Sequence, residues 1–587
     1  MTEPEAQPAQ GAHLAHHEHH EPHGLDRTSP RGRQAVALAA ILLLALAIRV
    51  WGIDFGLPYS YHNDEGAIVR RALSFGLGDL NPRSFHWPAF HLYVLFGLYA
   101  AIYAFGAALG TFASTGEFAG LYFRDPTVFY LAGRALSAFA GTATVYVTYR
   151  AARRLDSTRA GLWAALCLAL TYYHVRDSHL ATLDVPATFW TALAFLAAVE
   201  IDRGEASRWN YARAGIFAGL ATATKYNSGI VFLAIATAHT LRWPRPPLRH
   251  LALAAAAAAA TFAVATPFNW IDWPTFARDF AFQQRHLAEG QWGLTSGSAL
   301  AYYGRMLTSV QLRNTETFVF DPMVLLFVTG ALASPFLLDR RAAALVLVVP
   351  LAYLCYIGTW AMAATRYLDP IFPMLSIGAG SWIARRKSRA GIVLVALLLA
   401  LSLRASVLSD WTLSRKDTRT EAKEWIEAHI PPGTRIALES YTPPLAPSAS
   451  AIEARARSLE SGELQHPTQP PERVQLYYRW LKETAPKDGY DLVALNDSLL
   501  DAEAAERNRV PETNYDLERL RSLGVQYVIV SSFLYGRYRN ERASKLYPAL
   551  VAFYRTLERE HRLIKEFRPG RLQPGPVLRV YSMEKRS

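Results

Sequence analysis

Apolar segments long enough to cross a membrane follow one another through the first 408 residues. The first segment covers 35–53, and the later ones cover 128–149, 160–175, 185–201, 250–268, 321–338, 342–360, 369–384 and 390–408. Residues 212–241 are also apolar, but the polar run from Thr222 to Ser228 interrupts them and predicts a tight pair of short helices. Because the hydrocarbon core of a bilayer requires ~20 apolar residues per helix, the pattern predicts a polytopic α-helical membrane protein with about eleven transmembrane helices.

Arginine and lysine residues in the short loops predict the orientation of these helices. Every second short loop is basic, as in 150–159 and 385–389, whereas the alternate loops carry one basic residue each. By the positive-inside rule, the N-terminus lies inside and the residues after 409 lie outside. A single crossing by the apolar residues 88–110 would invert every later basic loop. We therefore expect these residues to form an interfacial or re-entrant helix within a long first external loop, 54–127.

Both ends of the chain differ in texture from the apolar part. Residues 1–33 are polar and contain six histidines, which could capture a metal, but we expect a disordered cytoplasmic tail. After residue 409, helical and β-rich patterns alternate, which predicts an external soluble α/β domain over 409–587. The transmembrane domain is then 34–408, and a bacterial inner, or cytoplasmic, membrane with the last domain in the periplasm is the expected location.

The composition agrees with this division. Only 19% of the 587 residues are charged, which is below the ~25% of typical soluble domains. The two cysteines, Cys167 and Cys355, lie in apolar stretches and are interpreted as small buried hydrophobes rather than as a redox pair. The net charge of +12 follows the loops that flank the apolar segments, so nucleic acid is not an expected partner.

The first external loop carries the first candidate chemistry. Asp64 and Glu65 follow the first span, where a carboxylate can act as a general base and partial desolvation raises its proton affinity. The alternative is a capping pair at the start of a surface helix. His86 lies further along the same loop and could bind a divalent metal or a phosphate, although its spacing matches no local metal motif.

Two later external segments add ionisable residues at the same face. Asp177 lies between the third and fourth spans, close to Asp184, which could instead cap the helix that starts near Pro186. Lys225 interrupts the apolar residues 212–241, and each arm is too short to cross the hydrocarbon. A buried ammonium requires an anionic partner such as a phosphate, and the alternative for Lys225 is snorkelling to the surface.

The last such segment contains Arg366 and Tyr367, which we interpret as candidates for substrate binding. A guanidinium at this depth can bind a lipid phosphate with two hydrogen bonds, although an ion pair with Asp369 is the alternative. Carboxylates, a lysine, an arginine and a histidine around one membrane-level cavity suit group transfer from a phosphate leaving group.

Several motifs in this order resemble a known family. They are NDEGAIVRRALSFGLGDLNP, FHWPAF, AGRALSAFAGTATVYVTYRAARRL, RDSHLATLDVPATFW, GLATATKYNSG, TRYLDPIFP and DTRTEAKEWIEAHIPPGTRIALES. Together they cover about 35–440 and resemble the GT-C glycosyltransferases of the family 39-like group. This group includes protein O-mannosyltransferases and the lipid A aminoarabinose transferase, and it depends on phospholipid carriers.

The resemblance implies a polyprenyl-phosphate-linked donor that gives a hexosyl or pentosyl group to an acceptor hydroxyl on the external face, with inversion. Asp64, with Glu65 beside it, takes the place of the catalytic acidic pair, and Lys225 and Arg366 take the place of the donor-phosphate groups. His86-Trp87-Pro88-Ala89 stands where aminoarabinose transferases have a Glu-Lys-Pro-Pro run that helps to bind metal. No cofactor is therefore assigned, and a divalent metal stays an open question.

The remaining questions concern partners and class. The acceptor can be a glycan, a lipid or a protein, and membrane lipid surrounds the chain. The alternative function is a transporter or flippase, or a non-catalytic binder of lipid-linked sugar. Transporters carry inverted repeats and charges at mid-depth, whereas this sequence has no evident repeat and its charges cluster at one face.

Overall fold

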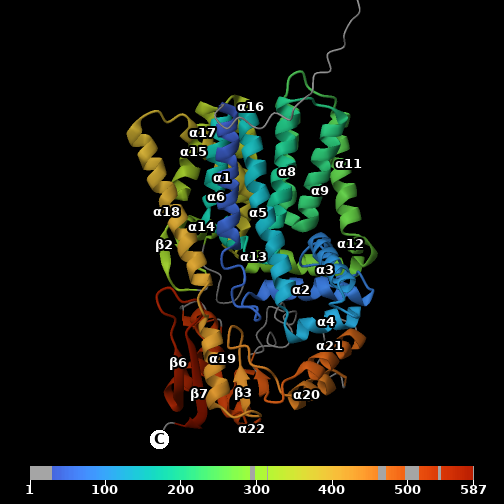
Figure 1. The fold of residues 1–587 in the computed structure, drawn as a ribbon, viewed down its shortest axis with the longest axis vertical. Coiled ribbons are helices and arrows are strands. Elements are labelled where there is room, and N and C mark those ends of the chain that lie inside the picture. Colours follow the sequence, from blue (N-terminus) through green and yellow to red (C-terminus); the bar gives the residue numbers. More distant parts are fainter. Residues whose placement is uncertain are drawn as a thin grey trace, which may run out of the picture.

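The computed structural model describes residues 30–290, 298–313, 315–460, 471–495, 514–539, 544–545 and 547–585. The six histidines of the N-terminal tail lie outside these residues. The molecule has three layers along its long axis: upright helices, a layer of shorter transverse helices, and a domain that contains a sheet (Figure 1).

The upright helices coincide with the predicted spans. They are α1 (Pro30–Val50), α5 (Thr127–Leu155), α6 (Thr158–Leu170), α8 (Asp184–Arg203), α9 (Arg208–Thr224), α10 (Phe232–Leu241), α11 (Leu248–Ala265), α15 (Met323–Leu337), α16 (Arg340–Gly358), α17 (Phe372–Ala384) and α18 (Arg389–Leu413). Among the described residues, seven helices are long and apolar enough to cross a membrane, and six of them, α1, α5, α8, α11, α16 and α18, belong to this bundle. The prediction of a multi-pass helical membrane protein is confirmed.

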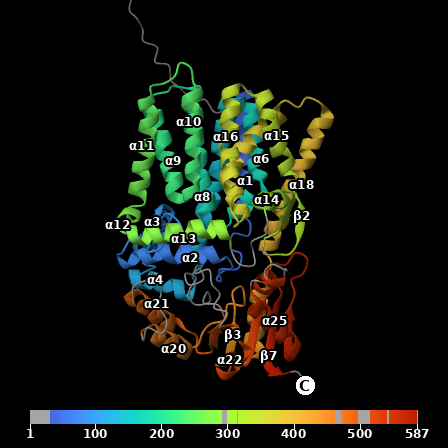
Figure 2. The same ribbon diagram turned by 180° about the vertical axis from the view of Figure 1, so that it is seen from behind.

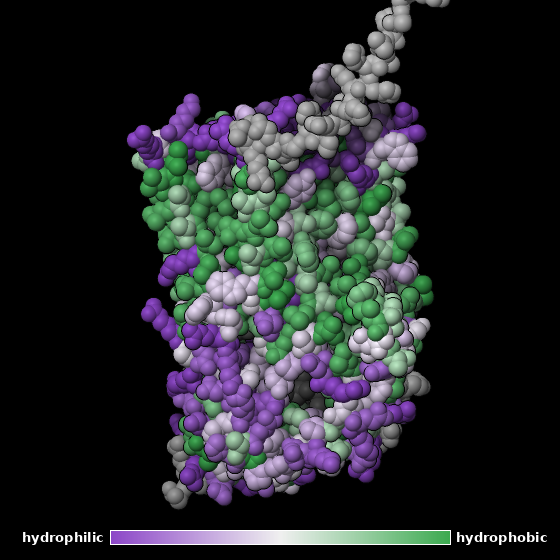
Figure 3. Space-filling view, in the orientation of Figure 1, coloured by the Kyte–Doolittle hydropathy of each residue, from purple (hydrophilic) through white to green (hydrophobic). Residues whose placement is uncertain are grey.

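Polar side chains cap the first turns of helices that begin on the side of the bundle far from the sheet domain. The Ser157 hydroxyl caps α6, the Ser207 hydroxyl caps α9 and the Asp339 carboxylate caps α16, each by accepting a backbone N–H of the first turn. Hydrophilic side chains cover this end and the sheet domain, and apolar side chains form the surface between them (Figure 3). This apolar band is the surface that a bilayer would cover.

The seventh long apolar helix is α3 (Phe90–Ala108). It lies with the transverse elements at the end of the bundle that faces the sheet domain (Figures 1 and 2). The other elements of this layer are α2 (Asn63–Ser74), α4 (Thr115–Arg124), α12 (Phe268–Ile271), α13 (Trp273–Glu289), α14 (Ala299–Thr308), β1 (Ser309–Gln311) and β2 (Phe318–Phe320). That 88–110 lies along the membrane surface rather than across the membrane stays a prediction.

The C-terminal part contains a five-stranded mixed sheet of order β4-β3-β5-β7-β6. Its strands are β3 (Arg435–Leu438), β4 (Asp491–Ala494), β5 (Tyr527–Ser531), β6 (His561–Phe567) and β7 (Leu578–Lys585). β3 is parallel to both β4 and β5, and β7 is antiparallel to β5 and β6. The helices of this domain are α19 (Thr418–His429), α20 (Ala449–Glu460), α21 (Pro471–Thr484), α22 (Leu517–Ser522), α23 (Ser532–Tyr535) and α25 (Pro548–Glu560). The expected α/β domain is confirmed.

Two breaks in the bundle create the space for a site. α9 ends at Thr224, Lys225 is extended, and a 3-10 segment over Tyr226–Val231 leads into α10. A second 3-10 segment, Thr365–Ile371, precedes α17. The prediction of two short helices interrupted at Lys225 is therefore confirmed. The two breaks place polar residues within the bundle, near the end that faces the transverse layer.

Candidate active site

An open cavity of about 660 Å³ lies between these helix breaks and the transverse layer. Five of the seven residues predicted to form the site line it: Asp64, His86, Lys225, Arg366 and Tyr367. They come from α2, the loop before α3, the break after α9 and the 3-10 segment before α17. Residues that are far apart in the chain therefore share one cavity.

Asp64 lies in the first turn of α2 and its carboxylate faces Arg366. The Oδ2 atom of Asp64 lies 3.3 Å from Nη2 of Arg366, and the Asp64 side chain is 28% exposed. His62 holds the N-cap position of α2, and its side chain makes no capping hydrogen bond within the described residues. Asp64 is thus oriented into the cavity beside a cation while it stays accessible to a substrate.

Glu65 points away from the cavity, into the protein. Its carboxylate accepts two hydrogen bonds from Arg134 of α5, at 2.8 and 2.9 Å, and a third from the backbone N–H of Ala181 at 2.8 Å. Both side chains of the pair are fully buried. Burial acts to raise the pKa of Glu65, but the Arg134 charge and these hydrogen bonds outweigh it and hold the pKa below its ordinary value. Glu65 therefore fixes α2 to α5, and the orientation of Asp64 depends on that contact.

Lys225 meets a carboxylate for which the sequence left helix capping as an alternative. Its Nζ atom forms an ion pair with Asp184 at the start of α8, and it lies 4.9 Å from the ring centre of Tyr367. The Lys225 side chain is only 12% exposed, so it does not snorkel to the surface. Asp184 also lines the cavity, and its pairing with Lys225 is the contact that the sequence analysis missed.

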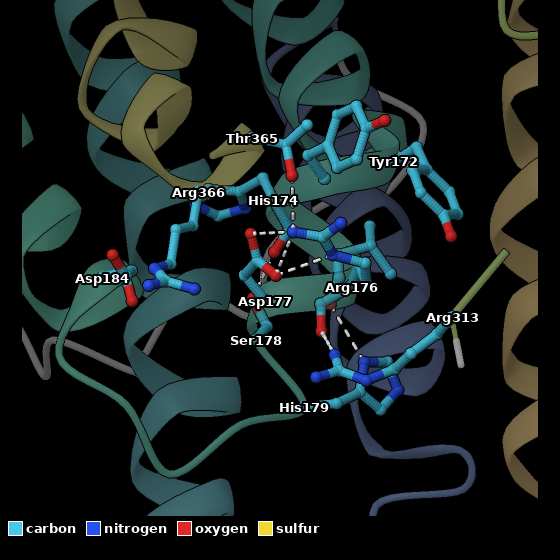
Figure 4. Close-up of polar contacts among 12 residues, drawn as sticks. Tyr172, His174, Arg176, Asp177, Ser178, His179, Asp184, Arg313, Thr365 and Arg366 are labelled. Carbon is cyan, nitrogen blue, oxygen red and sulfur yellow. Dashed lines mark hydrogen bonds and ion pairs between the residues drawn. The ribbon is translucent and has the colours of Figure 1, made fainter. Parts of the chain in front are cut away.

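Arg366 lies between two carboxylates rather than in a pair with Asp369. Its ion-pair partner is Asp64, and Figure 4 shows its guanidinium on the side of Asp184. The two carboxylate oxygens of Asp369 are buried and have no hydrogen-bond partner among the described residues. The alternative interpretation of Arg366 as a structural partner of Asp369 is therefore not supported.

Asp177 is near this cluster but does not line the cavity. Its carboxylate accepts hydrogen bonds from Arg176 at 2.7 and 2.9 Å, and Arg176 also donates to the Thr365 hydroxyl (Figure 4). Thr365 directly precedes Arg366. The Asp177–Arg176 pair thus supports the segment that carries Arg366, and substrate contact by Asp177 stays a prediction without geometric support.

His86 is positioned by its neighbour. The Phe85 N–H donates to Asp279 of α13 at 2.9 Å, and the Phe85 carbonyl accepts from the Tyr226 hydroxyl at 3.1 Å. The described residues contain no group of three or more His, Cys, Asp and Glu side chains that could hold a metal ion. Within that part of the chain His86 therefore has no ligand set around it, and no metal is assigned to the site.

Part of the cavity wall comes from residues that the sequence analysis did not single out. Gln283 and Gln284 of α13 line it, as do the aromatic rings of Tyr356 and Trp360. The Trp360 ring packs edge-on against Tyr367 at 5.3 Å. The two glutamines lie on α13, which is outside all the predicted spans. The amphipathic pattern over 273–289 was the signal in the sequence that could have indicated a helix at this surface.

Comparison with known proteins identifies the fold. The family model described as dolichyl-phosphate-mannose-protein mannosyltransferase matches residues 97–286. The crystal structure of ArnT from Cupriavidus metallidurans bound to undecaprenyl phosphate is 14% identical, covers 94% of this chain and 98% of that chain, and superimposes with a TM-score of 0.52. The apo structure of the same ArnT is 15% identical, with the same coverage of both chains and a TM-score of 0.51. None of the curated proteins compared with the chain matches it.

The fold is that of the GT-C membrane glycosyltransferases, as the sequence motifs indicated. The family match and the fold together indicate a glycosyltransferase, and the helical bundle makes it a multi-pass membrane protein.

Proposed function

We propose that this protein transfers a hexosyl or pentosyl group from a polyprenyl phosphate to an acceptor hydroxyl at the external face of the cytoplasmic membrane. The observation that carries the proposal is the convergence of Asp64, Arg366 and Lys225 in one cavity. One side chain in this set can accept a proton, and two can neutralise a phosphate. The likeness to an ArnT structure that contains undecaprenyl phosphate supports the choice of donor.

The donor phosphate binds Lys225 and Arg366 in this proposal. Both cations are paired with carboxylates in the ligand-free cavity, Lys225 with Asp184 and Arg366 with Asp64. A phosphate that reaches Arg366 takes the place of the Asp64 carboxylate and frees it for the acceptor. The two cations then stabilise the negative charge that develops on the departing polyprenyl phosphate.

Asp64 acts as the general base. It removes the proton of the acceptor hydroxyl while the acceptor oxygen forms its bond to the anomeric carbon and the bond from that carbon to the phosphate oxygen breaks. The electron pair of the broken bond leaves with the phosphate. Because the nucleophile attacks opposite the leaving group, a single displacement inverts the anomeric configuration. Glu65 is a positioning residue in this scheme, since its buried pair with Arg134 orients α2.

The orientation of the chain completes the proposal. The arginine-rich loops between α5 and α6 and between α17 and α18 lie at the end of the bundle far from the sheet domain (Figure 1). By the positive-inside rule this end faces the cytoplasm, so the cavity and the residues after 409 face the periplasm. A glycan, a lipid or a protein presented at that face can serve as the acceptor.

Radiolabel transfer tests the proposal. The full-length protein, purified in a neutral detergent, is incubated with polyprenyl phosphates that carry labelled hexoses or pentoses, one at a time, and with a membrane extract as acceptor. We expect one donor to release free polyprenyl phosphate as label enters acceptor material. If a donor binds but no polyprenyl phosphate is released with any sugar, the protein is a transporter or a non-catalytic binder and the proposal fails.

A further inference from the structure

A second and larger cavity, of about 1,780 Å³, lies on the other side of α2. Asp64 and Ile68 of α2 line the first cavity, whereas Ala67, Arg70, Arg71, Leu73 and Ser74 line the second. Four of this second set, Ala67, Arg70, Arg71 and Ser74, are spaced by three and four residues and share one face of the helix. The helices α3, α4 and α21 enclose the remaining sides.

The chemistry of the wall selects a class of ligand. Most lining residues are apolar or aromatic, with rings supplied by α3, α4 and α21. Among the described lining residues the charged ones are three arginines, Arg70, Arg71 and Arg473, and none of these described residues carries a carboxylate or a carboxamide. Apolar and aromatic walls with arginines as the charged groups suit an amphiphile with apolar chains and an anionic head group.

Both sides of the cavity are held in place by arginine contacts. Arg473 of α21 reaches across to Asp79, with Nη2 at 3.1 Å from Oδ2. The Arg71 guanidinium lies 5.4 Å from the ring centre of Trp87, and Trp87 lines the first cavity. An arginine of the second cavity therefore contacts an aromatic side chain that lines the first.

The position of α3 connects the second cavity with the membrane surface. Phe96, Tyr99 and Tyr103 of α3 line the cavity, while Phe105 near its end is 70% exposed and the adjacent Leu109 is 67% exposed. A helix that is apolar on its exposed side and aromatic on its cavity side lies at the boundary of a leaflet. Lipid from that leaflet can reach the cavity without crossing the polar surface of the sheet domain.

We propose that the second cavity binds an anionic phospholipid of the external leaflet, with its phosphate at Arg70, Arg71 and Arg473 and its acyl chains among the α3 and α4 rings. A polyprenyl phosphate shares this chemistry, but the proposed donor site is the first cavity, where Lys225 and Arg366 lie. The inference does not depend on the proposed transfer reaction, but the choice of the external leaflet rests on the orientation given with the proposed function.

Native mass spectrometry of the full-length protein in neutral detergent tests this site. The probes are phosphatidylglycerol, which is anionic, and phosphatidylcholine, which is zwitterionic, each titrated with and without polyprenyl phosphate. Ala100 of α3 lines the cavity and Ala104 of the same helix does not, although both are exposed. Ala100→Trp fills the space, and Ala104→Trp is its matched control. Arg70→Gln removes one charge, and Arg124→Gln, at an exposed position outside the cavity, is the control for it.

We expect the protein to retain one phosphatidylglycerol molecule at lipid concentrations where it retains no phosphatidylcholine. Ala100→Trp and Arg70→Gln each weaken phosphatidylglycerol binding about ten-fold or more, and both control variants bind as the unaltered protein does. Thermal unfolding of every variant shows whether it is folded, and Arg70→Gln decides the question if Ala100→Trp does not fold. Equal binding of the two lipids, retention by folded Arg70→Gln, or displacement of phosphatidylglycerol by polyprenyl phosphate overturns the assignment.

Discussion

Substitution of Glu65 by glutamine separates a positioning role from a catalytic one. The two Arg134 hydrogen bonds and the Ala181 hydrogen bond surround a carboxylate that is fully buried. The Glu65→Gln substitution would leave the Arg134 guanidinium buried without its counter-charge, and removal of one partner of a buried ion pair costs roughly 3–5 kcal/mol. With an unfolding entropy of about 2.1 cal/mol/K per residue over the 587 residues of the chain, this loss corresponds to a fall in Tm of roughly 2–4 °C.

Thermal unfolding in detergent measures this loss, and donor turnover per folded molecule is measured at a temperature where the variant is still native. We expect Glu65→Gln to lower Tm by this amount, while the pH dependence of its residual turnover stays that of the unaltered protein. Glu518→Gln, at a carboxylate that is 79% exposed, is the matched control and should leave Tm nearly unchanged. An unchanged Tm together with a shifted pH profile or abolished turnover would show that Glu65 is the base and would refute the reasoning.

Three other predictions concern the donor site, the sheet domain and the topology. Lys225→Ala and Arg366→Ala should each lower kcat/KM for the donor on the order of 100-fold. Arg366→Lys should restore only part of the lost kcat/KM, because one ammonium cannot form a two-pronged contact. Normal donor kinetics in a folded alanine variant would remove that residue from the site. Glu439, buried at the end of β3, accepts hydrogen bonds from Ser531 N–H and the Tyr554 hydroxyl, and burial raises its pKa to about 8. Between the ordinary pKa of a glutamate and about pH 8, the native protein therefore keeps a proton that the unfolded chain has lost. The free energy of unfolding falls across this pH window by up to ~1.4 kcal/mol per pH unit. The dependence of Tm on pH should therefore be flatter in Glu439→Gln. A fusion reporter at residue 120 should report the external side, and a cytoplasmic signal there would show that α3 crosses the membrane.

The helical bundle could be predicted because the bilayer fixes both the length and the polarity of each span. The break at Lys225 followed from the same arithmetic, since neither arm of 212–241 is long enough to cross alone. The sheet domain was recognised from local strand and helix patterns. These features depend on residues that are close together in the sequence, so they can be predicted from one sequence alone.

The contacts inside the site depend on residues that are far apart in the chain. Asp64 and Glu65 are adjacent, but successive residues of a helix point about 100° apart, and only the packing of α2 on Arg134 shows which one faces the cavity. The Lys225–Asp184 pair joins positions 41 residues apart. Asp177 was a candidate for substrate binding from the sequence, and its bond to Arg176 became visible only in the fold.

The most direct test of the account is the turnover of Asp64→Asn. Asparagine keeps the shape of the side chain and can still contact Arg366, but it cannot take the proton from the hydroxyl of the acceptor substrate. With the labelled donor and acceptor extract described above, we predict a loss of transfer on the order of 100-fold or more, with unchanged Tm and nearly unchanged donor binding. Transfer at the rate of the unaltered protein by folded Asp64→Asn would contradict the assignment of Asp64 as the base, and with it the proposed mechanism.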